Sequence, residues 1–152
     1  MMERREFLIG TLGLGALSLT ACAPSGPGVV TIVAQGTAGM NPGPDGADRP
    51  LTLQIVQMRS AGAFDGADFF ALQNPQAALG GEFIKADQVA LTPGAAKTLS
   101  IGLDAGTTVI GVIAGFRDPA GKVFRAKAGV SATESVTFSV EVSRSGVTLR
   151  AA

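Results

Sequence analysis

The chain alternates apolar and polar residues over short segments, with the period of two that is typical of half-buried β-strands. In the segment 51–58, for example, Leu51, Leu53 and Ile55 fall on one face. The segment 109–116 is apolar throughout, which predicts a strand in the centre of a sheet. Eight strands are predicted, over 29–35, 51–58, 83–91, 97–103, 107–116, 123–128, 135–142 and 147–150.

Clusters of Gly, Pro, Asp and Ser separate these strands at the short intervals that antiparallel sheets use. Short strands with one dry and one wet face predict an all-β fold, an antiparallel β-sandwich. One connection is longer, because residues 36–50 contain the sequence Asn-Pro-Gly-Pro-Asp-Gly at 41–46. This density of turn residues predicts a long exposed loop, and loops of this length are often functional.

A helical period replaces the strand period after the second predicted strand. Asp65 is expected to cap a short helix in which Phe69 and Leu72 share a face. Pro75 is expected to open a second helical turn, which Gly80–Gly81 closes. The segment is therefore predicted to be a small helical insertion over one sheet. An aromatic ligand site is the alternative, but burial against the sandwich is favoured for its apolar side chains Phe64, Phe69, Phe70 and Leu72.

The N-terminus has the features of a secretory signal. Arg4 and Arg5 precede an apolar run over 7–21, which is too short to span a bilayer comfortably. The run closes in Leu-Thr-Ala-Cys at 19–22, which resembles a bacterial lipobox, where the bond before the Cys is cut and its thiol receives diacylglycerol. The prediction is a signal peptide over 1–21, a lipidated Cys22 at the start of a flexible tether over 22–28, and a folded domain over 29–152.

Two neighbouring features concern export and sorting. Arg4 and Arg5, followed by Phe7 and Leu8, resemble the twin-arginine export motif, and both this route and the general secretory route stay open. Ala23 stands where Asp is the inner-membrane retention signal in enteric bacteria. Similarity to that sorting rule implies localisation in the outer membrane, with the lipid-anchored domain facing the periplasm of a Gram-negative bacterium.

Composition argues against several classes of function. The 152 residues carry 12 basic and 12 acidic side chains, so the net charge is zero and no basic field is available to hold nucleic acid. His is absent and there is one Cys, which removes the usual general base and the commonest transition-metal ligand. No Lys stands in a Ser-x-x-Lys spacing. We therefore predict no enzyme, no small-molecule substrate, and no cofactor other than the covalent lipid on Cys22.

The tetrapeptide Asp-Gly-Ala-Asp occurs twice, at 45–48 and at 65–68. Closely spaced carboxylates beside Gly can contribute to a calcium site, which needs six to eight oxygen ligands. Neither copy continues as a calcium loop does, and Asp and Gly are ordinary turn and cap residues. No metal site is predicted.

Besides the lipobox, five segments follow one another along the chain, namely Asn41-Pro42, Arg49-Pro50 with the strand 51–58, Phe64 to Leu72, Leu91-x-Pro93-Gly94, and 109–118. In their order and spacing they resemble the TssJ (VasD/SciN) family of type VI secretion lipoproteins. The resemblance implies a transthyretin-like β-sandwich with a helical insertion, anchored in the outer membrane. It also implies a partner, the periplasmic C-terminal region of the inner-membrane protein TssM.

In this family the first inter-strand loop contacts the partner, which implies the same role for the loop over 40–49 here. The residues expected to bind are Met40, Asn41, Pro42, Asp45, Asp48 and Arg49. The side chain of Met40 is the expected apolar anchor, because an adaptable thioether suits a partner surface. The alternative, that Met40 packs back onto the edge of the sandwich, stays open.

Two functions from different classes follow from these features. The first is a structural component of the type VI secretion membrane complex, which binds TssM. The second is a free-standing periplasmic binding or inhibitor module that takes a peptide, protease or glycan through its loops or an exposed sheet edge.

Overall fold

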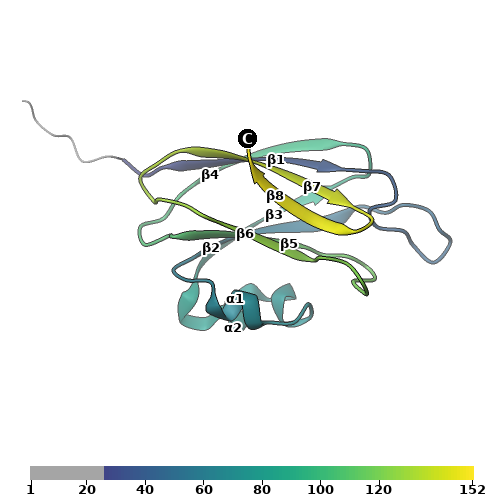
Figure 1. Cartoon of the computed structure of the whole chain (residues 1–152), viewed down its shortest axis with the longest axis horizontal. Coiled ribbons are helices and arrows are strands. Elements are labelled where there is room, and N and C mark those ends of the chain that lie inside the picture. Colours follow the sequence, from purple (N-terminus) through teal and green to yellow (C-terminus); the bar gives the residue numbers. More distant parts are fainter. Residues whose placement is uncertain (1–25) are drawn as a thin grey trace, which may run out of the picture.

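The structure, a computed structural model, describes residues 26–152. Two four-stranded sheets pack face to face in it (Figure 1). The eight strands are β1 (Val29–Gly36), β2 (Leu51–Met58), β3 (Phe83–Leu91), β4 (Ala96–Gly102), β5 (Val109–Ala114), β6 (Arg125–Gly129), β7 (Val136–Ser143) and β8 (Gly146–Ala151). Arg4, Arg5, Cys22 and Ala23 lie outside the described residues, so their roles stay predictions.

The strand order is β4-β1-β7-β8 in one sheet and β3-β2-β5-β6 in the other. The predicted β-sandwich of about eight strands is confirmed, and β5 lies between β2 and β6, in the interior of its sheet as its apolar sequence predicts. One pair departs from antiparallel order, because β1 and β7 run parallel. Parallel neighbours need a long crossover, and here the chain between them builds the whole second sheet.

The main core lies between the two sheets. Along β1, Val30, Ile32 and Ala34 are buried while their neighbours are more exposed, and β7 repeats the pattern with Phe138 and Val140. Full burial of each Val, Ile or Phe side chain in this core contributes about 1.5–3 kcal/mol to folding. The period of two in the sequence therefore corresponds to alternation between this core and solvent.

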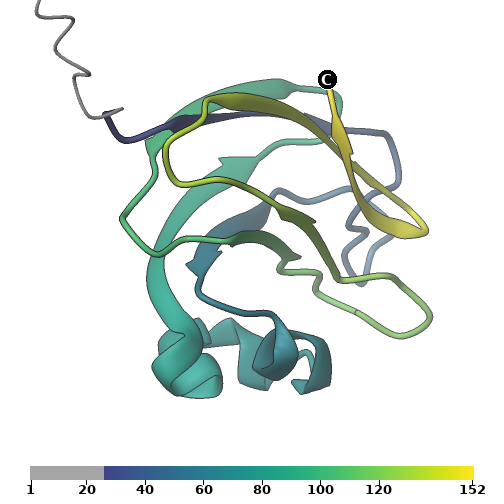
Figure 2. The same ribbon diagram turned by 60° about the vertical axis from the view of Figure 1, so that its left-hand side comes forward.

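A helical insertion after β2 covers the outer face of the second sheet (Figures 1 and 2). It consists of α1 (Gly62–Gly66), η1 (Ala71–Gln73), α2 (Pro75–Leu79) and η2 (Gly80–Glu82). Its buried side chains form a second core with those of β2 and β5, made of Val56, Met58, Phe64, Leu72, Leu79 and Ile113. The insertion predicted from the sequence is confirmed, and because of it β2 is buried on both faces.

Two details of the predicted insertion are wrong. Asp65 does not cap a helix, because α1 begins at Gly62 and Asp65 lies inside it. Phe70 is not part of the core, since its side chain is 77% exposed. Residues 67–70 are not helical, and of this pair of adjacent aromatic residues it is Phe69 that packs inward, edge to face with Phe124 at 5.4 Å between ring centroids.

The insertion is fastened to the sheet by the guanidinium of Arg125 on β6. It donates hydrogen bonds to the backbone carbonyls of Phe64 (2.8 Å), Asp65 (2.7 Å) and Ala67. These carbonyls lie near the C-terminal end of α1, where backbone acceptors lack helical partners and a cation is favourable.

No helix in the described part of the chain is long and apolar enough to cross a membrane.

Candidate partner-binding site

The sandwich has two ends with different loops. We call the end formed by 37–50, 92–95, 115–124 and 143–146 the loop end, and the end formed by 26–28, 103–108 and 130–135 the tether end. Gly28 is fixed at the tether end, since its N–H donates to the carbonyl of Ala132 (2.7 Å) and its carbonyl accepts from Leu103 N–H (2.9 Å). β1 spans eight residues from there to the loop end, which is roughly 26 Å at strand geometry (Figure 1).

Loop 37–50 has a defined internal structure. The carboxylate of Asp48 accepts hydrogen bonds from the backbone N–H groups of Gly39 (2.5 Å) and Asn41 (2.9 Å). Further out, Gly43 N–H donates to the carbonyl of Ala47 (2.7 Å) and closes the tip. Because its own backbone groups are paired in this way, the loop presents a shape that is set before any partner arrives.

Asn41 joins this loop to the loop over 115–124. Its side chain is 4% exposed. The amide Nδ2 donates to the carbonyl of Pro50 (3.1 Å), and Oδ1 accepts from the backbone N–H of Arg117 (2.9 Å). One buried amide thus uses both its donor and its acceptor to hold two loops that lie 76 residues apart in sequence. Asn41 therefore positions both loops.

Met40 does not provide an exposed anchor, so that expectation is wrong. Its side chain is fully buried and belongs to the main core. The absence of a side chain at Gly36 makes room for it, since a Cβ there would lie 2.6 Å from the Met40 sulfur. Of the two alternatives that the sequence leaves open for Met40, the structure shows packing against the sandwich.

Of the other residues expected to bind, Asp45 and Arg49 are exposed and Asp48 is half-buried. Arg49 and Asp45 form an ion pair at 3.2 Å, with their side chains 51% and 60% exposed. At this exposure the pair adds little to stability, but it holds the Arg49 guanidinium over Gly43. Pro42, on the same loop, is exposed as well.

An open cleft of about 410 Å³ lies between the two loops. Its lining residues are Asn41, Arg49, Pro50, Leu51, Thr52, Ala90, Gly115 and Arg117. Arg117 was absent from the predicted binding residues. The segment that contains it contributes to the family resemblance, but no local pattern places residue 117 beside residue 49, because only the packing of the sandwich brings the two loops together.

Both carboxylates of the loop have lowered pKa values. The pKa of Asp48 lies below its ordinary value of 3.8, mainly because Asn41 N–H donates to the carboxylate, with a further contribution from Gly39 N–H against the opposing effect of burial. The pKa of Asp45 is lowered chiefly by the N–H of Ala47 and then by Arg49. Both groups are therefore held in the charged form.

The lowered pKa of Asp48 predicts an acid-dependent loss of loop stability. A carboxylate with a depressed folded-state pKa stabilises the fold above its unfolded pKa, near 3.8, and this contribution is lost as the pH falls through the folded value. The free energy of unfolding of Asp48→Asn, measured with urea at pH 7, should be lower than that of the unsubstituted chain. The difference should shrink at pH 3. An equal difference at both pH values would contradict this role of Asp48.

The second copy of Asp-Gly-Ala-Asp is also used structurally. Asp65 pairs with Lys127 on β6, and Asp68 accepts a hydrogen bond from the N–H of Ala71 (2.7 Å). Within residues 26–152, no three Asp, Glu, His or Cys side chains gather as metal ligands do. The carboxylates of Asp65 and Asp68 thus form an ion pair and a hydrogen bond within the chain.

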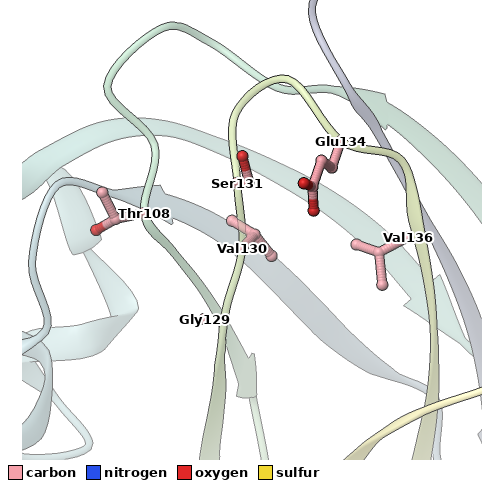
Figure 3. A pocket seen from close by; sticks show the side chains of 6 residues that line it. All are labelled: Thr108, Gly129, Val130, Ser131, Glu134 and Val136. Carbon is pink, nitrogen blue, oxygen red and sulfur yellow. The ribbon is translucent and has the colours of Figure 1, made fainter.

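A separate cavity of about 330 Å³ lies at the tether end (Figure 3). Thr108 lies on one side of Val130, while Glu134 and Val136 lie on the other. Glu134 is the one ionisable residue that lines it. The cavity opens on the end from which the chain continues toward Cys22.

Comparison with known proteins agrees with this architecture. The family model described as "Type VI secretion lipoprotein, VasD, EvfM, TssJ" matches residues 29–145, which is most of the folded domain. The chain belongs to this family. Comparison with curated protein sequences found no significant match.

Solved structures of the family are similar to the chain over most of its length. The T6SS lipoprotein TssJ1 from Pseudomonas aeruginosa matches with a TM-score of 0.76 and 27% identity, over 84% of this chain and 98% of that one. Serratia marcescens Lip, described as a membrane-bound component of the type VI secretion system, matches with a TM-score of 0.74 and 26% identity, over 83% and 98%. A chain in a structure described as the TssM C-terminal domain from EAEC matches with a TM-score of 0.65 and 26% identity, over 82% and 97%.

Family membership assigns the chain to the lipoproteins of the type VI secretion membrane complex. This is a structural role in a secretion system. It favours the first of the two functions considered from the sequence over a free-standing binding module.

Proposed function

We propose that the chain is held in the outer membrane by a lipid on Cys22 and binds the periplasmic C-terminal region of TssM through its loop end. It would thereby connect the outer membrane to an inner-membrane protein. The proposal joins three parts: a lipid anchor that the sequence predicts, a rigid sandwich, and a pre-organised loop.

The main support for this function is the position of loop 37–50 at the opposite end of the sandwich from the tether. Gly28 is hydrogen-bonded at the tether end, and the loop lies at the opposite end of β1. The tether over 22–28 reaches at most about 25 Å when fully extended. A lipid on Cys22 would therefore keep the tether end near the membrane, while the rigid strands project the loop end into the periplasm.

The internal bonding of the loop supports the same role. Asp48 and Asn41 fix the backbone of the loop without using its outermost residues, so Pro42, Pro44 and Asp45 stay exposed. A surface ordered in advance loses less conformational entropy on binding than a flexible one. The similar chain in the structure described as the TssM C-terminal domain is consistent with a partner of this kind.

The test is a binding measurement that leaves the fold intact. The mature chain carrying Cys22→Ser is titrated with the periplasmic region of TssM, beside a variant in which residues 44–47 are replaced by Gly-Ser-Gly-Ser. Met40, Asn41 and Asp48 are kept, because their side chains hold the core and the loop. We expect saturable binding that weakens at least about tenfold in the variant, because the exposed tip and its fixed shape are lost.

A replacement of residues 131–134 by the same four residues serves as the matched control, since it changes a loop at the tether end. Thermal unfolding verifies that each variant is folded. The proposal fails if the unsubstituted chain does not bind, or if the tether-end variant weakens binding as much as the loop-end variant does.

A further inference from the structure

Two arginines from separate loops line the cleft at the loop end. Arg49 comes from the loop that precedes β2, and Arg117 from the loop that follows β5. The side chain of Asn41 bonds to the carbonyl of Pro50 and to the N–H of Arg117, so it fixes the backbone beside both arginines. Both arginines thus line one recess, with Leu51 and Ala90 among its apolar lining.

The side chain of Arg117 has unused hydrogen-bond donors. Its backbone N–H is bonded to Asn41, but its guanidinium makes no hydrogen bond or ion pair with any residue in 26–152. Arg49 uses one nitrogen, Nη2, for both oxygens of Asp45, which leaves its remaining N–H groups free. Because a guanidinium carries five N–H donors in a fixed fork, the cleft has unused capacity for an acceptor with two oxygens.

The charges at the two ends of the sandwich also differ. The loop end carries four basic and three acidic residues, Arg49, Arg117, Lys122 and Arg144 against Asp45, Asp48 and Asp118. All three carboxylates accept hydrogen bonds from neighbouring backbone N–H groups. The tether end carries two acidic residues in its loops, Asp104 and Glu134, against one basic residue, Arg59, which follows β2 and accepts a hydrogen bond from Thr108 through its carbonyl. Although the chain is neutral overall, the loop end attracts negative charge and the tether end does not.

We propose that the cleft receives the carboxylate of an Asp or Glu side chain of the protein partner, held by Arg117 with Arg49 beside it. The inference rests on the proposed function, since it assigns the chemistry of the partner at the same end of the molecule. Arg–carboxylate contacts are frequently bidentate and are stronger than neutral hydrogen bonds. Pro50, Leu51 and Ala90 supply an apolar surface around the ion pair. Asn41 is a positioning residue for this contact.

Charge reversal at Arg117 tests the inference. Binding of the periplasmic region of TssM to the mature Cys22→Ser chain is compared with binding to Arg117→Glu and to Arg117→Gln. We expect the glutamate variant to bind at least about tenfold more weakly and the glutamine variant to lie between the two. Affinity of the unsubstituted chain should also fall with added salt, and this dependence should be smaller for Arg117→Gln. Both variants should fold normally, because the Arg117 side chain is exposed and makes no polar contact in the described residues.

Arg150→Glu is the matched control. It makes the same charge change on an exposed side chain near the far end of β8 and should leave affinity unchanged within about twofold. Reversal of single acidic residues on the partner to Lys should identify one that restores binding to Arg117→Glu. If the unsubstituted chain binds and Arg117→Glu binds equally well, the cleft inference is wrong while the proposed function stands. If the unsubstituted chain does not bind at all, the proposed function fails and the inference fails with it.

Discussion

Replacement of Cys22 by serine is expected to release the chain from the membrane fraction into the soluble periplasmic fraction. Each buried acyl methylene contributes about 0.8 kcal/mol to membrane attachment, so a lipid with two or three chains holds a protein stably, and its loss leaves no comparable attachment. Sedimentation of cell envelopes followed by immunoblotting measures the change. Intact-mass analysis of the unsubstituted chain should show cleavage before Cys22 and the added lipid.

Two neighbouring substitutions make this experiment specific. Ser25→Ala changes a nearby residue without touching the thiol and should leave the chain in the membrane fraction. Ala23→Asp should keep the lipid but move the chain from outer to inner membrane in an enteric host, as density-gradient fractions would show. Absence of the lipid mass from the unsubstituted chain would contradict the lipid anchor.

Replacement of Gln57 by leucine is expected to lower the free energy of unfolding by about 2–4 kcal/mol. Gln57 is fully buried on β2, and its amide makes three hydrogen bonds to the last residue of β4 and to the segment that follows it. Nε2 donates to the carbonyl of Gly102 (3.0 Å), while Oε1 accepts from Asp104 N–H (2.8 Å) and the Thr107 hydroxyl (2.9 Å). Leucine has a similar size but leaves these groups without a partner, and each unsatisfied buried group costs about 1–3 kcal/mol. Urea unfolding at pH 7 measures the loss.

Gln54→Leu is the matched control on the same strand. Gln54 is also buried, but its amide makes only long contacts, 3.4 Å to the carbonyl of Leu72 and 3.5 Å to Gln88. Its replacement should cost less than about 1 kcal/mol. Equal losses in the two variants would show that the Gln57 network has no special role in stability.

The strands of this protein were predictable because their pattern is local. The alternation along β1 and β7 and the unbroken apolar run of β5 indicate a half-buried or a central position without knowledge of any neighbour. The predictions were wrong where the burial of a residue depends on a side chain from another part of the chain. Phe69 and Phe70 are adjacent and equally apolar, and only the presence of Phe124 makes one of them half-buried and leaves the other exposed.

In the candidate site, too, local features could be predicted from the sequence, and features that depend on distant residues could not. The length of loop 37–50 and its turn residues were evident from the sequence, as were the charges of Asp45 and Arg49. Met40 belongs to the core because there is space for its side chain above Gly36. The burial of Asn41 depends on its bond to the N–H of Arg117, 76 residues away. Some of the loop residues predicted to bind a partner, Met40 and Asn41, are therefore buried and stabilise the structure. The predicted residues did not include Arg117, which lines the cleft.

By itself, the sequence determined the eight-stranded sandwich with its insertion, because a period of two and the turn residues between strands act over a few neighbouring positions. The family resemblance, carried by residues spread along the chain, was likewise available from the sequence and is confirmed. The tertiary structure alone decided that β1 and β7 are parallel neighbours, which side chains of the loop face outward, and that Arg49 and Arg117 share one cleft. The physical reason is that these features depend on contacts between segments far apart in sequence, which no local pattern encodes.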